Sequence, residues 1–206
     1  MKKPIAVIDF ETTGLSPGQG GRATEVAIVL LEGGRVVDRF QSLMNAGVRI
    51  PAFITQLTGI TNAMVAQAPP AEEVMREAAR FVGTAPMAAH NASFDRQFWV
   101  AELALAGVAA PHDFACTVLL SRRLIPEAPS HKLGLLIDFL GLPRAGRAHR
   151  ALADAEMAAA LLAHMQDRLQ QQWPGLQPDH ALLRALQGRS KAQTPAWLAR
   201  QAGGGA

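Results

Sequence analysis

The order of strand-like and helix-like segments is the feature of this sequence that most limits its fold. Three segments rich in apolar and β-branched residues come first and predict strands, at residues 5–8, 24–31 and 35–42. Gly33 and Gly34, between the last two, suit a tight turn, so the opening predicts an antiparallel meander. Helix-like segments then alternate with short apolar segments near residues 86–89 and 115–118, which predicts a mixed α/β fold.

Four longer helices are predicted after the meander, at residues 71–82, 92–106, 132–140 and 152–171. Asn91 is expected to cap the second of these with its side chain, and Gly107 to end it. A Trp-Pro-Gly break after the last helix separates a domain at 1–172 from a C-terminal tail at 173–206. The tail is expected to be partly helical and frayed at its terminal glycines, with an amphipathic helix near 179–186 that docks on its own domain or on a partner.

The cysteine content and the lengths of the apolar runs indicate the cellular location of the protein. Cys116 is the only cysteine, so neither an internal disulfide nor a cysteine-rich zinc site is available. The first apolar run is interrupted at Asp9 and Glu11, unlike the core of a secretory signal, and no apolar stretch approaches the ~18 residues of a membrane helix. We therefore expect a cytoplasmic location without membrane contact.

Basic residues are slightly in excess and gather in one stretch. The formal net charge is +3, and 16 of the 20 basic residues are arginine, which suits bidentate contact with phosphate. Six basic residues and two acids lie between residues 122 and 150, a balance of 6 − 2 = +4; the basic residues are Arg122, Arg123, Lys132, Arg144, Arg147 and Arg150. This stretch could hold a phosphate backbone or could be an ordinary solvated face.

Two acids follow the first predicted strand. Asp9 and Glu11 are two residues apart, so their side chains point the same way. Burying two uncompensated anions beside an apolar strand is costly, and bound Mg²⁺ or Mn²⁺ would remove the conflict because these cations take carboxylate oxygens as ligands. The alternative is that the strand has ended and both acids are solvated.

Two further clusters combine histidine with aspartate. At residues 90–95, Asp95 is expected in the first turn of a helix, where the helix dipole alone favours an acid, and His90 is either a structural hydrogen-bonding group or a substrate contact. His149 and Asp154 would point about 140° apart on one helix, so they share a site only if His149 precedes the helix and Asp154 lies in its first turn. A histidine in that place could accept a proton; the alternative is an exposed histidine beside a helix start.

The three segments occur in the order and with the spacing of one enzyme family. Asp9-Phe10-Glu11-Thr12-Thr13-Gly14, His90 through Asp95 and His149 through Asp154 resemble the three motifs of DnaQ-like (DEDDh) exonucleases, which include the proofreading epsilon subunit of bacterial DNA polymerase III. Leu57-Thr58-Gly59-Ile60-Thr61 is similar to the family's connecting segment. The resemblance spans residues 4–166. It implies a ribonuclease H-like fold, in which a three-strand antiparallel meander and further parallel strands form a mixed sheet flanked by helices.

The resemblance also implies a site. Four carboxylates would hold two divalent ions, Mg²⁺ or Mn²⁺: Asp9, Glu11, Asp95 and Asp154. His149 would be the general base. The implied substrate contacts are Thr12 through its backbone, Leu15 against a base, His90 and Asn91. Two cations would bind the attacking and leaving oxygens of a phosphodiester while a neutral histidine removes a proton from water, so activity should rise with pH through the range near ~6.5 where an ordinary histidine titrates.

The expected activity is 3'→5' hydrolysis of nucleic acid, with single-stranded DNA as substrate and nucleoside monophosphates as products. An RNA-trimming exoribonuclease of the same family and a non-catalytic nuclease-fold module used for assembly are the alternatives. Expected partners are nucleic-acid 3' ends and, through the tail at 173–206, a DNA polymerase or a replication or repair protein. A stand-alone or loosely associated enzyme is favoured over a tightly bound polymerase subunit.

Overall fold

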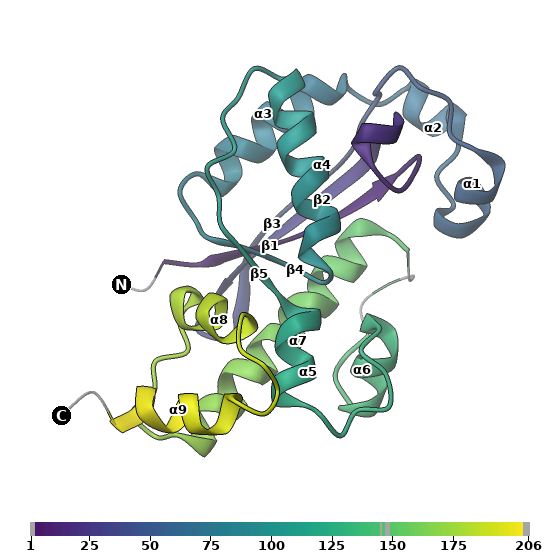
Figure 1. Ribbon diagram of the computed structural model, residues 1–206. Helices are drawn as coiled ribbons and strands as arrows, with labels where there is room; N and C mark the ends of the chain where they lie inside the picture. The colour runs from purple at the N-terminus through teal and green to yellow at the C-terminus, as the bar shows by residue number, and fades with distance from the viewer. Residues whose placement is uncertain (1–2, 145, 147–148, 204–206) are drawn as a thin grey trace.

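The computed structural model describes residues 3–144, 146 and 149–203. Its centre is a five-stranded sheet with the strand order β3-β2-β1-β4-β5 (Figure 1). The antiparallel part contains β1 (Ile5–Thr12), β2 (Ala23–Glu32) and β3 (Arg35–Leu43). The parallel part adds β4 (Met87–Ala89) beside β1 and β5 (Phe114–Cys116) beside β4. The predicted mixed sheet of a meander plus parallel strands is confirmed.

The turn between β2 and β3 contains the predicted glycine pair. Gly33 and Gly34 have φ values of 56° and 79°, in the left-handed region that glycine adopts without steric cost. β2 is buried along most of its length, whereas β3 forms the sheet edge and exposes Arg35, Asp38 and Arg39. Charged side chains on an edge strand discourage pairing with another chain.

Helices cover both faces of the sheet (Figure 1). One face is covered by α3 (Ala71–Val82) and α4 (Ala92–Leu105), and the other by α5 (Thr117–Leu124), α7 (Ala151–Gln172) and α8 (His180–Gln187). The remaining helices are η1 (Pro17–Gln19), α1 (Ala52–Thr58), α2 (Asn62–Ala66), α6 (Leu133–Phe139) and α9 (Thr194–Gly203). Within the described parts of the chain, none of the helices combines the length and apolar character that crossing a bilayer demands.

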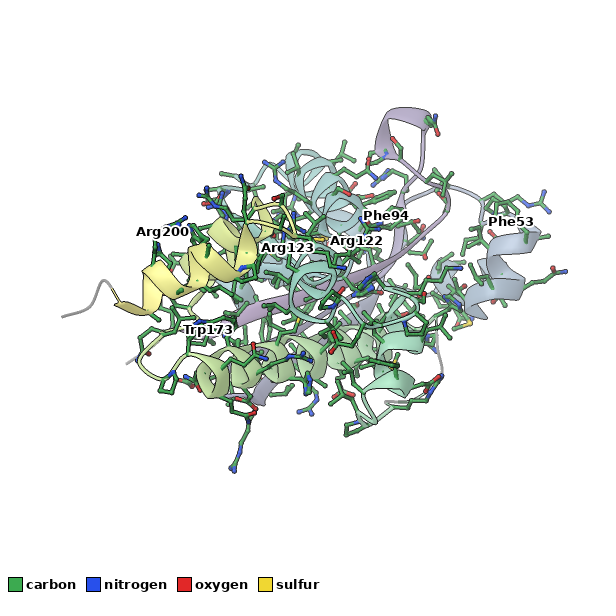
Figure 2. The ribbon with its side chains drawn as sticks, turned by 60° about the horizontal axis from the view of Figure 1, so that its bottom comes forward. Phe53, Phe94, Arg122, Arg123, Trp173 and Arg200 are labelled. Atoms are coloured by element: carbon green, nitrogen blue, oxygen red, sulfur yellow. The ribbon has the colours of Figure 1, made fainter. Side chains whose placement is uncertain are left out.

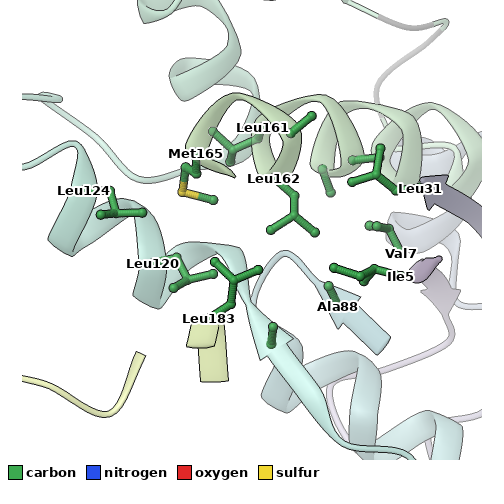
Figure 3. Close-up of a cluster of buried hydrophobic side chains, with 14 of the residues drawn as sticks. Ile5, Val7, Leu31, Ala88, Leu120, Leu124, Leu161, Leu162, Met165 and Leu183 are labelled. Carbon is green, nitrogen blue, oxygen red and sulfur yellow. The ribbon is translucent and has the colours of Figure 1, made fainter. Parts of the chain in front are cut away.

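Alternate residues of β1 enter two separate hydrophobic cores. Ile5 and Val7 pack with side chains of α7, α5 and α8 (Figure 3), whereas Ala6 and Ile8 pack with side chains of α3 and α4. Because side chains alternate along a strand, Asp9 and Glu11 continue the row of Ile5 and Val7. The fold therefore directs both acids to the face that α7 covers.

The last two helices, α8 and α9, pack into the same hydrophobic core as α7. Leu183 and Leu186 of α8 and Trp197 and Leu198 of α9 are buried there, so the amphipathic helix predicted near 179–186 docks on its own domain. Full burial of one leucine contributes roughly 1.5–3 kcal/mol to stability. The division of the chain at residue 172 stays a prediction. Of the glycines expected to fray, Gly203 closes α9, and residues 204–206 lie outside the described part.

One strand boundary and one capping interaction differ from the prediction. The strand expected at 115–118 lies at Phe114–Cys116, and Thr117 opens α5 instead, because so short an apolar run fits a strand or a buried helix equally well. Asn91 makes no capping hydrogen bond to α4. Its backbone is left-handed with φ 74°, and its side-chain oxygen accepts a hydrogen bond from Ser93 Oγ at 3.3 Å.

Candidate active site

Asp9 and Glu11 lie inside β1, which continues past its apolar run to Thr12. Pairing with β2 holds this extension, with Asp9 opposite Ala27 and Glu11 opposite Glu25. Asp9 is half-buried and Glu11 is only 8% exposed. The alternative of two solvated acids beyond the end of a strand is therefore wrong.

His149 and Asp154 lie at the start of α7. The helix begins at Ala151, so His149 precedes it and Asp154 lies in its first turn, as a shared site requires. His149 has a left-handed backbone with φ 60°, and its backbone N–H donates to Asp154 Oδ2 at 3.1 Å. Ligand atoms of Glu11, His149 and Asp154 all lie within 4.8 Å of one another, so these three side chains could hold a metal ion.

Asp95 approaches the same place from the other face of the sheet. It lies in the first turn of α4, is 2% exposed, and accepts the backbone N–H of Phe10 at 3.3 Å. It is close enough to Asp9 and Glu11 for the negative charges to repel one another. The structure thus brings the four predicted acids and His149 together at the end of the central strand.

Burial is the largest cause that raises the pKa of all four carboxyl groups, and repulsion from neighbouring acids adds to it. Burial first, then repulsion from Asp154, raises the pKa of Glu11 to about 8. Burial raises the pKa of Asp95 to about 8, although backbone N–H groups oppose the shift, and the pKa values of Asp9 and Asp154 rise chiefly by burial as well. Four ionised acids here need added positive charge, and an all-oxygen carboxylate set is the one that hard divalent cations prefer.

The metal-free protein should lose stability as pH rises. The folded pKa values of Glu11 and Asp95, about 8, exceed the ordinary values of 4.5 and 3.8. The folded chain therefore holds more protons than the unfolded chain, and stability present below about pH 4 is lost as pH rises through about 8. We expect the Tm measured in EDTA to fall over this range and Mg²⁺ to restore it. A Glu11→Gln/Asp95→Asn control should lose the part of this dependence that these two residues contribute and keep the part due to Asp9 and Asp154; an unchanged profile in the control would contradict the assignment.

Glu25 is a site residue that the sequence analysis did not single out. It is 1% exposed and accepts Arg150 Nη2 at 2.8 Å, Arg150 Nε at 3.1 Å and the backbone N–H of Ala151 at 3.1 Å. These bonds anchor the start of α7, and hence His149 and Asp154, to β2. The signal in the sequence is an acid inside an otherwise apolar strand, which requires a partner when it is buried.

The basic stretch at 122–150 is divided between different environments. Arg150 is engaged by Glu25, and Arg144 donates to both carboxylate oxygens of Asp138, at 2.8 and 2.6 Å. Arg147 lies outside the described residues. Lys132 is exposed at the site itself. The stretch as a whole is therefore not one phosphate-binding surface.

Two clefts open onto the acids. Both contain Asp9, His149 and Asp154. The first, of about 260 Å³, also has an apolar rim formed by Leu15, Phe53, Leu57 and Phe94. The second, of about 400 Å³, contains His90 and Lys132. The apolar rim offers surfaces for bases, and the sequence analysis did not single out its aromatic members, Phe53 in α1 and Phe94 in the first turn of α4.

Thr12 and Leu15 both line the first cleft. Thr12 is buried, and its hydroxyl donates to the carbonyl of Gly14 at 2.7 Å, so its side chain is already engaged. Leu15 is 80% exposed, and its carbonyl accepts a hydrogen bond from Gln97 Nε2 at 3.1 Å. A backbone role for Thr12 and a packing role for Leu15 are compatible with these positions and stay predictions.

His90 and Asn91 differ in their relation to the clefts. His90 Nε2 lies 3.0 Å from the carbonyl of His131 and therefore donates to it, while Nδ1 lies 2.8 Å from Thr117 Oγ1. Burial lowers the pKa of His90 to about 4, so the ring is neutral. Both ring nitrogens are occupied, which favours the structural interpretation. Asn91 is not among the described residues that line either cleft.

Acidic side chains gathered at the end of the central strand of such a mixed sheet define the ribonuclease H-like class of nucleases. The sequence model of the exonuclease family RNase_T matches residues 6–162. The chain therefore belongs to the family of DEDDh exonucleases, as the three motifs predicted.

Relatives and solved structures agree with this membership. The 3'-5' exonuclease DinG of Bacillus subtilis (strain 168) is 39% identical over 171 residues, which are 82% of this chain and 18% of DinG. The DNA polymerase III subunit epsilon-like protein of Rhodobacter capsulatus is 40% identical over 162 residues, 77% of this chain and 23% of that protein. The chain thus spans less than a quarter of the length of either relative.

Among solved structures, exonuclease X in complex with 5' overhanging duplex DNA has a TM-score of 0.66 at 31% identity, covering 79% of this chain and 91% of the other. The nuclease domain of 3'hExo, a DEDDh family member bound to rAMP, has a TM-score of 0.69 at 23% identity, covering 81% and 92%. The second likeness concerns the fold alone. Together they confirm the predicted ribonuclease H-like fold.

Proposed function

We propose that the chain is a 3'→5' exonuclease that hydrolyses phosphodiester bonds at the 3' end of single-stranded DNA and releases nucleoside monophosphates. The observation that carries this proposal is the convergence of Glu11, His149 and Asp154 within 4.8 Å, beside two further buried or half-buried acids. The relatives named as 3'-5' exonuclease and as polymerase III subunits support the direction of attack and the choice of DNA.

Two Mg²⁺ or Mn²⁺ ions fit the donor set of this site. Asp9, Glu11, Asp95 and Asp154 would hold them. When bound, such ions lower the pKa of a water molecule and stabilise charge on the leaving oxygen. The raised pKa values of these four carboxyl groups support the assignment, because the cluster lacks the positive charge that would keep all of them ionised.

The chain's own residues have separate tasks in this mechanism. His149 removes the proton from the attacking water, and the hydrogen bond from its backbone to Asp154 holds His149 beside the first turn of α7. The Glu25–Arg150 pair fixes the helix start. The backbone of Thr12 contacts the terminal nucleotide, and the apolar rim of the first cleft packs against its base.

DNA is favoured over RNA by the duplex DNA held in the structure of exonuclease X. The polymerase III relatives support an association with a replication or repair protein through the tail, and the docking of α8 and α9 on their own core supports the stand-alone alternative. The buried, unpaired Cys116 fits a reducing cytoplasm, where we place the protein.

The test is digestion of end-labelled single-stranded DNA, mismatched duplex DNA and RNA of the same sequence, with Mg²⁺, with Mn²⁺ and with EDTA. We expect a 3' label to be released at once as a mononucleotide and a 5' label to yield a ladder, both only with metal and most rapidly on single-stranded DNA. Absence of products with either metal would support the alternative of a non-catalytic nuclease-fold module. Faster digestion of RNA than of DNA would support an exoribonuclease.

A further inference from the structure

The C-terminal segment carries more positive charge than the chain as a whole. Residues 181–200 contain no acid and four basic residues, Arg184, Arg189, Lys191 and Arg200. Their +4 exceeds the formal net charge of +3, so the rest of the chain sums to 3 − 4 = −1. Leucine and tryptophan side chains of α8 and α9 are buried in the core, which leaves the basic side chains on the outside.

The end of α5 lies against this segment and adds two arginines. Arg123 Nε donates to the carbonyl of Arg189, and Arg123 Nη1 to that of Leu119, both at 2.6 Å, so the two segments are tied together. Burial is the main reason why the pKa of His131 is lowered. Arg122 and Lys191 both lie near enough to His131 to lower it further. We call Arg122, Arg123, Arg189 and Lys191 the cationic surface.

Acids within the described chain do little to neutralise the cationic surface. Arg189 lies over the ring of Trp197, at 5.4 Å from its centroid. Glu127 is near Lys191 but is already paired with Arg168 at 2.9 Å. Clustered like charge disfavours the folded state, so this arrangement costs stability unless an anionic ligand is present.

The cationic surface is continuous with the second cleft of the active site. The carbonyl of His131 accepts the hydrogen bond from His90, and His90 and the exposed Lys132 line that cleft with Asp9. In the view of Figure 2, Arg122 and Arg123 are seen on the side of the molecule that also carries Arg200 of α9. Positive side chains are therefore present at the second cleft, at Lys132, and around the neighbouring His131, at Arg122 and Lys191.

We infer that the cationic surface binds the sugar-phosphate backbone of the strand whose 3' end occupies the active site. The inference rests on the proposed function. A strand is the occupant that fits, because phosphates repeat along it and can meet cations spread over several elements, and because the surface begins beside a cleft that receives the strand's terminus. The segment at 173–203, which follows the part matched by the family, would then lengthen the substrate track.

Binding of short and long strands separates this surface from the active site. A strand of about 20 nucleotides, at ~3.4 Å each, is longer than the molecule is wide, whereas a trinucleotide reaches ~10 Å and stays in the cleft. The full chain with Asp154→Asn, in EDTA, is titrated against fluorescent single-stranded DNA of both lengths. Arg122→Gln/Lys191→Gln removes two charges from the surface, and Arg35→Gln/Arg80→Gln removes two exposed charges elsewhere as the matched control.

We expect the surface variant to bind the long strand about tenfold more weakly, with a salt dependence reduced by about 1.4, since each single-strand phosphate contact contributes ~0.7 to the slope. Its affinity for the trinucleotide should not change, and its Tm should stay the same or rise, because two repelling charges are removed. Equal loss in the control, no loss in the surface variant, or polyglutamate binding as tightly as DNA would overturn the inference. An unmutated chain that cleaves neither strand would instead overturn the proposed function, while a length-dependent loss of binding would still support the surface.

Discussion

Cleavage is expected to slow by about a thousandfold when Asp154 is replaced by asparagine. The substitution removes one negative charge from the acids around Glu11 and His149 but keeps the shape of the side chain. The amide oxygen of asparagine can still accept the backbone N–H of His149, so the start of α7 should fold as before. If the substitution removes about 4 kcal/mol of the stabilisation that the metal ions give to the transition state, the rate falls by about a thousandfold.

The measurement is the rate of release of a 3' label by Asp154→Asn over a range of Mg²⁺ and Mn²⁺ concentrations, together with cation binding by calorimetry. The matched control is Asp167→Asn, which removes an exposed acid from the same helix and should keep full activity. An Asp154→Asn chain that cleaves at the normal rate would remove Asp154 from the metal assignment. A loss shared by the control would point to the net charge of α7 instead.

Local sequence patterns predicted which strands and helices are present better than they predicted the residues at which these begin and end. The apolar run that predicts β1 stops at Ile8, yet the strand continues to Thr12 because the chain pairs with β2 through this region. A local pattern cannot register that partner, since strand pairing is a tertiary interaction. Thr117 illustrates the same limit, because the apolar residues around it suit a strand and a buried helix equally.

The five central site residues could be predicted because three segments together have the order and spacing of one family's motifs, whereas each segment alone also suited a structural role. Glu25 could not, because its role depends on Arg150, 125 positions later in the chain. Asn91 was assigned a capping side chain from its residue type, whereas the structure uses its tolerance of the left-handed backbone. Residue type thus identified the right position and the wrong interaction.

Replacing His149 with alanine is expected to slow cleavage by ~10²–10⁴-fold, the range for loss of a general base. The residual rate should lose the part of its pH dependence that a histidine base imparts. Because His149 has a left-handed backbone, part of any loss could come from strain with alanine. His149→Asn should be equally slow without that strain, since asparagine tolerates this conformation. His164→Ala, on α7 and outside both clefts, is the matched control and should remain active.

Cation binding distinguishes a base from a ligand at this position, because His149 lies within 4.8 Å of two carboxylates and could serve as either. If it is the base, His149→Asn keeps the calorimetric affinity for Mn²⁺ while cleavage is slow, since the carboxylates hold the ions without it. If it is a ligand, affinity and rate fall together and additional Mn²⁺ restores the rate. We expect the first result, because imidazole is a poorer ligand for Mg²⁺ than the carboxylates that surround it. Rescue by Mn²⁺ would instead make His149 part of the metal site and leave the proton acceptor to be sought elsewhere.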